Sequence, residues 1–249
     1  MDESADRGEQ KVFCVGAVIG SDAKWQWLKD EWDAILKPEG LSYFRSNDCA
    51  TINGEFLKFR KDRYKVSPAE KKKGEDIRHK LLEKISDSLV TGVGMAIDMD
   101  DFRNVANTPA KLESFGGTPY YHCYFLTMEQ CALIVKQHLS EVALAFGYDE
   151  HQKYGPHLES VYGDFKRNRP ELAPHMTTLA PFDDRTFIPV QVADVIASVV
   201  RKYTLWKIAK PRPRRPHELR LLEKKHTMSI MRVCGTPCLN EFLKDKGLL

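Results

Sequence analysis

Short apolar runs and longer amphipathic stretches alternate along the chain. The runs at residues 11–20 and 90–98 are rich in β-branched side chains and predict buried strands. Apolar residues at helical spacing predict long helices at 120–139 and 189–206. The same pattern predicts shorter helices at 22–37, 77–89 and 157–166, and short strands at 141–148 and 176–181. Strands that alternate with helices indicate the α/β class.

Two stretches lack such a pattern, and a third marks a boundary. Residues 41–75 are mixed and basic and receive no assignment, whereas 107–119 contain Pro109, Gly116 and Gly117 and predict a loop. The Pro/Arg run at 210–216 cannot form a helix and predicts an extended segment. We therefore expect one domain over residues 1–206, followed at 207–249 by a basic Pro/Arg linker and a C-terminal helical extension.

Length and composition fit a single globular core. The chain has 249 residues, 42% of them hydrophobic, and no apolar run as long as a membrane span. Its acidic start lacks the features of a signal peptide, so we expect a cytoplasmic protein without a membrane partner. Because the cytoplasm keeps thiols reduced, we expect the six scattered cysteines to be free of disulfide bonds. Cys234 and Cys238 form a C-x3-C pair that matches no standard zinc module.

Positive charge gathers in two segments, although the net charge is only +3. Residues 57–73 and 207–225 each hold eight Lys or Arg against two acids. Such clusters either neutralise the phosphates of a nucleic acid or are a solvated loop and a solvated tail. As candidate nucleic-acid contacts we take Lys58, Arg60, Lys61, Arg212, Arg214 and Arg215.

Acidic residues stand at the ends of the predicted strands, where an α/β sheet presents its chemistry. Asp149 and Glu150 follow one strand, whereas Asp98 ends another and is best explained as a turn residue. Asp194 lies in an otherwise apolar helix, and Gln191 shares its helix face. A carboxylate in such surroundings must be paired, hydrogen-bonded or bound to a cation. Asp194 is therefore the first candidate for a functional role.

Four stretches together resemble one family. They are Asp2-Glu3-Ser4, Phe-Arg-Ser-Asn-Asp at 44–48, Asp149-Glu150 after a strand, and Gln191-Val-Ala-Asp194. Their order across roughly residues 2–205 is similar to that of the domain of unknown function 3800 family. Members resemble the ribonuclease H-like superfamily, which implies a mixed β-sheet with helices on both faces. This chain departs from the family at Ala5, where a glycine is usual, and at Arg45, where a histidine is usual.

The resemblance also implies an acidic site for Mg²⁺ or Mn²⁺. Carried over by position, the catalytic residues are Asp2, Asp149 and Asp194, and Glu3 and Glu150 join them as metal ligands. Gln191 and Arg45 would support the site. Two divalent ions ~4 Å apart stabilise both the attacking and the leaving oxygen of a phosphodiester.

We therefore expect a metal-dependent nuclease that acts on DNA or RNA. The main alternative is a catalytically degenerate nucleic-acid-binding or regulatory protein with a role in defence or mobile-element biology. A third is a hydrolase of another phosphate ester. Walker, G-x-G-x-x-G, G-x-S-x-G and H-E-x-x-H motifs are missing, which excludes the best-marked nucleotide-binding, serine-hydrolase and zinc-protease classes. The sequence leaves the substrate and the oligomeric state open.

Overall fold

The computed structural model describes residues 1–5, 11–62, 64–139, 142–150, 155–209, 216–224 and 227–249. The strands are β1 (Asp2–Ala5), β2 (Val12–Ile19), β3 (Thr91–Asp98), β4 (Leu144–Asp149), β5 (Met176–Phe182) and β6 (Met228–Cys234). The helices are α1 (Asp22–Leu36), η1 (Lys37–Glu39), α2 (Ser46–Thr51), η2 (Gly54–Phe59), α3 (Pro68–Asp87), α4 (Met99–Val105), α5 (Pro109–Ser114), α6 (Pro119–His138), α7 (Gly155–Asn168), η3 (Ala173–His175), α8 (Ile188–Ala209), α9 (His217–Lys224) and α10 (Thr236–Asp245).

The strands form a mixed four-stranded sheet in the order β1-β2-β3-β6 and a parallel pair, β4 and β5. Strands β1 and β3 are antiparallel to β2, while β6 runs parallel to β3. The backbone nitrogen of Met1 donates a hydrogen bond of 2.5 Å to the carbonyl oxygen of Gly147. This bond places the start of β1 beside β4, so the two groups of strands adjoin there.

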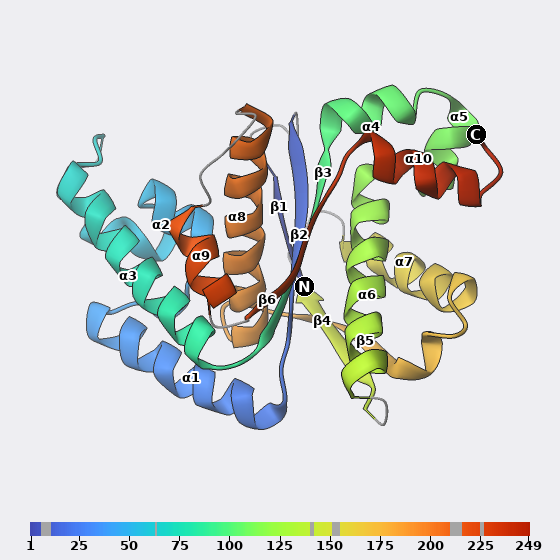
Figure 1. Ribbon diagram of the computed structural model, residues 1–249. Helices are drawn as coiled ribbons and strands as arrows, with labels where there is room; N and C mark the ends of the chain where they lie inside the picture. Colours follow the sequence, from blue (N-terminus) through green and yellow to red (C-terminus); the bar gives the residue numbers. More distant parts are fainter. Residues whose placement is uncertain (6–10, 63, 140–141, 151–154, 210–215, 225–226) are drawn as a thin grey trace.

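Helices cover the sheet on both faces (Figure 1). On one face Val12 and Cys14 of β2 pack with the apolar sides of α1, α3, α8 and α9. On the other face Phe13 and Val15 pack with α4, α6, α7 and α10. Because successive residues of a strand point to opposite faces, one β-branched and aromatic run supplies both cores. The mixed α/β class predicted from the sequence is confirmed.

Helix α8 lies unusually close to the sheet. A Cβ atom on Gly16 of β2 would lie 2.5 Å from the Ala193 carbonyl oxygen and 2.5 Å from the Ala197 nitrogen. Farther along the helix, a Cβ on Gly94 of β3 would lie 2.3 Å from the side chain of Val200. Gly16 therefore lets the α8 backbone lie directly on β2, and Gly94 leaves room for the Val200 side chain on β3.

Most predicted elements are present, with several differences. Helix α3 starts at Pro68, well before the predicted 77, because Ser67 and Glu70 form a capping box. The predicted loop 107–119 contains α5, which starts at Pro109 behind the capping side chain of Thr108. The unassigned residues 41–75 hold η2 and all of α2. Strand β4 starts at Leu144 rather than 141.

The segment predicted as a helical extension also contributes a strand. Strand β6 pairs with β3 from Gly92↔Met228 to Ile97↔Cys234, and α9 and α10 flank it in the sequence. The prediction of helices alone for this segment was therefore wrong for Met228–Cys234. The predicted extended run at 210–216 lies, apart from Pro216, outside the described residues.

The expectation of reduced thiols is wrong for one pair of cysteines. Cys234 ends β6, Cys238 lies in the first turn of α10, and a disulfide bond joins them across a Cα–Cα distance of 5.3 Å. The tight turn through Gly235 brings the two side chains together. Cys14, Cys49, Cys123 and Cys131 are buried thiols that take part in no disulfide bond among the described residues. Among the helices of the described residues, none combines the length and apolarity that a membrane span requires.

Candidate functional site

Strand β1 directs its two acids to opposite faces of the sheet. Asp2 pairs with Gly16, the residue against which α8 packs, and directly paired residues point to the same face. The half-buried Asp2 side chain therefore faces α8. Glu3 points the other way, and its carboxylate accepts a hydrogen bond of 3.3 Å from the Tyr124 hydroxyl of α6. The structure thus separates Glu3 from Asp2, which the family resemblance placed together as ligands.

Strand β4 presents Asp149 on the same face as Asp2. Phe146 and Tyr148 are buried in the core beneath α6 and α7, so the alternating Asp149 points toward α8. The negative charge of Asp149 acts on both Asp2 and Arg45. Glu150 lies just beyond the strand and is exposed, and its backbone nitrogen continues the ladder to Phe182. Of the two acids predicted here, only Asp149 joins the site.

Asp194 projects from the first half of α8. The helix presents buried residues on both sides of this acid, and the Asp194 side chain itself is half-buried. One carboxylate oxygen accepts a hydrogen bond of 2.5 Å from the backbone nitrogen of Ser46. The contact of Ala193 with Gly16 fixes the adjacent Asp194 above β2, next to the strand that carries Asp2.

Three consecutive residues at 44–46 bind the start of α8 and the turn before it. The backbone nitrogen of Phe44 donates to Gln191 Oε1 at 3.0 Å, and that of Ser46 donates to Asp194. Between them, the Arg45 guanidinium donates hydrogen bonds to both carboxylate oxygens of Asp184, from Nη2 to Oδ1 at 2.7 Å and from Nε to Oδ2. The two stretches singled out in the sequence, 44–48 and 191–194, therefore form one unit in space.

Gln191 is the structural centre of this unit. It is buried, and its Oε1 also accepts a hydrogen bond of 2.8 Å from the Trp32 indole nitrogen of α1. Its Nε2 donates to the carbonyl oxygen of Asp184 at 2.7 Å. With both ends of the amide occupied, Gln191 positions α1, the 44–46 segment and α8 rather than a ligand.

Asp184 is a site residue that sequence reasoning missed. It lies in the turn between β5 and α8, is buried, and pairs with Arg45 in a bidentate arrangement. This pairing, together with the charge of Asp149, raises the pKa of Arg45 above its usual value. The sequence offered only a weak signal, an acidic turn before the helix, because the partner Arg45 is 139 residues away.

Burial and mutual repulsion disfavour the ionised forms of the converging acids. Burial raises the pKa of Asp2 well above its usual value, and the charges of Asp194, Glu3 and Asp149 raise it further. Burial also raises the pKa of Asp194 to about 6, although the hydrogen bond from Ser46 and the charge of Arg78 oppose this shift. The charges of Asp149 and Asp194 therefore add to the cost of ionising the buried Asp2 carboxyl.

The donor set has the chemistry that a divalent cation needs. Asp2, Asp149 and Asp194 supply carboxylate oxygens, the ligands preferred by Mg²⁺ and Mn²⁺, and a cation would offset their repulsion. Within the part of the chain that the structure describes, no three Asp, Glu, His or Cys side chains form a ready-made metal-binding group. The acids fit such an ion by the chemistry of their oxygens and by facing the same side of the sheet.

The predicted nucleic-acid contacts differ in their surroundings. Lys58 donates to the carbonyl oxygen of Gly40 and pairs with Glu55 at 3.2 Å. Arg60 Nη2 reaches the Thr51 carbonyl oxygen at 3.4 Å. Both side chains thus connect η2 and the residue after it to neighbouring segments. Lys58 and Lys61 are exposed, and Arg60 is partly buried. Arg212, Arg214 and Arg215 lie outside the described residues.

The fold and the site together define a mixed α/β protein with a half-buried acidic centre on the α8 face of its sheet. Comparison with known proteins adds no relative: no protein-family model matches the chain, and no curated protein or solved structure is significantly similar to it.

Lowering the pH from 7 to 5 should stabilise the metal-free protein through Asp194. The folded-state pKa of about 6 exceeds the usual 3.8, so the stabilising effect of this group is complete below about pH 3.8 and is lost as the pH rises through 6. Between pH 7 and 5 the gain should be on the order of 1 kcal/mol. Asp2, Asp184, Arg78 and the Ser46 N–H all influence this carboxyl.

Urea unfolding at several pH values in the presence of a chelator measures this effect. Asp194→Asn, which has no proton to gain here, should flatten the pH dependence in this window. Equal slopes in the variant and the wild type would contradict the assignment of the raised pKa to Asp194.

Proposed function

We propose that the protein is a divalent-metal-dependent nuclease that hydrolyses phosphodiester bonds in DNA or RNA. The observation that carries this proposal is that Asp2, Asp149 and Asp194, from two strands and a helix, face the same side of the sheet, where Asp149 and Asp194 both act on Asp2. Carboxylates that repel one another are costly to a fold unless they bind a cation. A grouping of this kind is expected at functional sites.

The strand arrangement supports a ribonuclease H-like version of this fold. An antiparallel meander β1-β2-β3 adjoins a parallel pair β4-β5, and the Met1 to Gly147 hydrogen bond sets β1 beside β4. Acids from β1, from the end of β4 and from a late helix then face the same side of the sheet. This arrangement also favours the proposed relationship to the domain of unknown function 3800 family.

Asp2, Asp149 and Asp194 would hold Mg²⁺ or Mn²⁺. When bound, these ions stabilise charge on the attacking and leaving oxygens of the phosphodiester. The chain's own contribution is to set the acids in place: Gly16 admits α8 onto β2, and the Ser46 N–H orients the Asp194 carboxylate.

Arg45 adds a fixed positive charge at the rim of the acids. Its side chain is 33% exposed and is oriented by the bidentate bond to Asp184. A guanidinium in that position suits a phosphate oxygen of the substrate. Arg45 would therefore position a phosphate near the carboxylates, in place of the histidine usual in the family.

The test is cleavage of labelled single-stranded and double-stranded DNA and RNA by the purified protein with Mn²⁺, Mg²⁺ or chelator. The expected result is cleavage of at least one polynucleotide that needs the metal and stops with the chelator. Salt-dependent binding without cleavage under any metal would overturn the nuclease and favour a nucleic-acid-binding protein. Phosphate release from small esters, with polynucleotides left intact, would overturn it in favour of another phosphate-ester hydrolase.

A further inference from the structure

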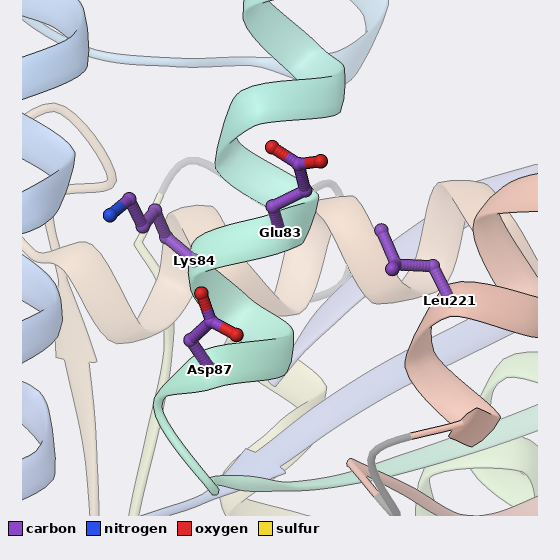
Figure 2. A pocket seen from close by; sticks show the side chains of 4 residues that line it. All are labelled: Glu83, Lys84, Asp87 and Leu221. Atoms are coloured by element: carbon purple, nitrogen blue, oxygen red, sulfur yellow. The ribbon is translucent and has the colours of Figure 1, made fainter.

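Two polar pockets lie along α3 and α9, and none of the three carboxylates lines either of them. One, of about 330 Å³, is lined by Glu83, Lys84, Asp87 and Leu221 (Figure 2). Its one cation, Lys84, pairs with Glu31 of α1 at 2.5 Å and points away from Leu221 (Figure 2). The positive charge of this pocket is therefore already paired within the protein, and nothing in the pocket indicates a ligand.

The other pocket, of about 400 Å³, lies between α3, α8 and α9 and contains a buried arginine. Arg78 is only 7% exposed, and its Nη1 lies 3.4 Å from a carboxylate oxygen of Glu218. Neither Nε nor Nη2 of Arg78 has a hydrogen-bond partner among the described residues. Two buried N–H donors without acceptors are costly, and a bound group with two oxygens would satisfy both.

Further donors surround Arg78. Lys202 of α8 lies 3.3 Å from Glu218, and burial together with the charge of Arg78 lowers the pKa of Lys202. The rings of His79 and His217 lie 5.1 Å apart at the same pocket. Helix α9 begins at His217, so its first backbone N–H groups and its positive dipole end lie here.

The carboxylates around the pocket do not cancel this positive charge. Glu218 is a single acid shared by two cations, Arg78 and Lys202. Glu75 and Asp76, the other two acids at the pocket, are exposed on α3, where water and salt screen their charges. Next to Arg78, two cations therefore share a single partly buried acid.

We infer that this pocket binds the phosphate group of a small phosphorylated ligand. Two phosphate oxygens match the fork formed by Nε and Nη2 of Arg78, and Lys202 and the start of α9 supply further donors. Because the two nitrogens are covered in the structure, the more exposed Lys202 and His217 side chains must shift to admit the ligand. A pocket of this volume accommodates a group as large as a nucleoside monophosphate.

Calorimetry and thermal unfolding of the full chain with inorganic phosphate, in the presence of a chelator, test this inference. Phosphate should bind and raise the midpoint of unfolding, and a nucleoside monophosphate that binds more tightly would identify a nucleotide rather than free phosphate as the source. Lys202→Gln and His217→Ala should each weaken phosphate binding by about tenfold, and Arg78→Lys, which keeps the charge but loses the fork, should weaken it further.

Two controls separate this site from its surroundings and from the proposed nuclease site. Arg220→Gln removes an exposed charge from α9 outside the pocket and should leave the affinity unchanged. Asp149→Asn, which alters the proposed nuclease site, should also bind phosphate normally, so failure of the proposed nuclease leaves this result unaffected. The inference would be overturned if the wild type did not bind phosphate. It would also be overturned if the Lys202→Gln and His217→Ala variants bound phosphate with the same affinity as the wild type.

Discussion

Replacing Asp194 with Asn should abolish Mn²⁺ binding and lower metal-dependent cleavage by roughly 10³-fold, because it removes one carboxylate from the centre of the site. The same change should stabilise the metal-free protein by about 1 kcal/mol. Asp194 is half-buried and its pKa is raised, so its negative charge destabilises the fold at neutral pH. Asparagine keeps an oxygen that can accept the Ser46 N–H without carrying that charge.

The opposite signs of these two effects distinguish a lost ligand from a damaged fold. Calorimetry with Mn²⁺, cleavage assays and urea unfolding on the same preparations measure both. Asp30→Asn provides the matched control, since Asp30 is an exposed carboxylate on α1 whose loss changes the net charge equally. If the Asp194→Asn variant binds Mn²⁺ as tightly as the wild type, Asp194 is not a ligand of the proposed metal site.

Replacing Gly16 with Val should lower the free energy of unfolding by about 3 kcal/mol or more. Even the first added carbon would lie 2.5 Å from two backbone atoms of α8, and backbone cannot rotate away as a side chain can. Helix α8 would have to move off the sheet, which also separates Asp194 from Asp2. Chemical denaturation measures the loss of stability, and Mn²⁺ binding should weaken in any protein that still folds.

Gly163→Ala is the matched control for this substitution. Gly163 lies inside α7, and an added Cβ would meet only the end of the Arg167 side chain, at 3.4 Å. Because alanine favours a helix over glycine by up to about 1 kcal/mol, this variant should be as stable as the wild type or more so. A Gly16→Val protein with wild-type stability would show that α8 can shift without cost.

Elements with a strong local pattern could be predicted from the sequence, and elements defined by distant contacts could not. The periodicity of α6 and α8 and the apolar runs of β2 and β3 are properties of adjacent residues, so their positions agree closely with the prediction. Strand β6 is short and follows a basic segment, and its partner β3 lies more than a hundred residues earlier. Its strand identity comes from that pairing rather than from its own pattern.

The same division holds for the site. Asp194 could be singled out because a carboxylate among apolar helix residues needs a partner, and the structure shows it half-buried and hydrogen-bonded. Asp184 could not, because its importance depends on Arg45, which only the fold brings near. Glu3 was grouped with Asp2 through the family resemblance, yet neighbours on a strand point to opposite faces, and this rule alone separates them.

The pairing of β3 with β6 has a consequence for synthesis on the ribosome. Ile97 pairs with Cys234, so at ~5–20 residues per second the edge of β3 waits on the order of ten seconds for its partner. Throughout that time β3 presents unpaired N–H and C=O groups beside an apolar core, a template for pairing with another nascent chain. Slowing translation after residue 98 should therefore increase aggregation, and a chaperone that covers this edge should reduce it.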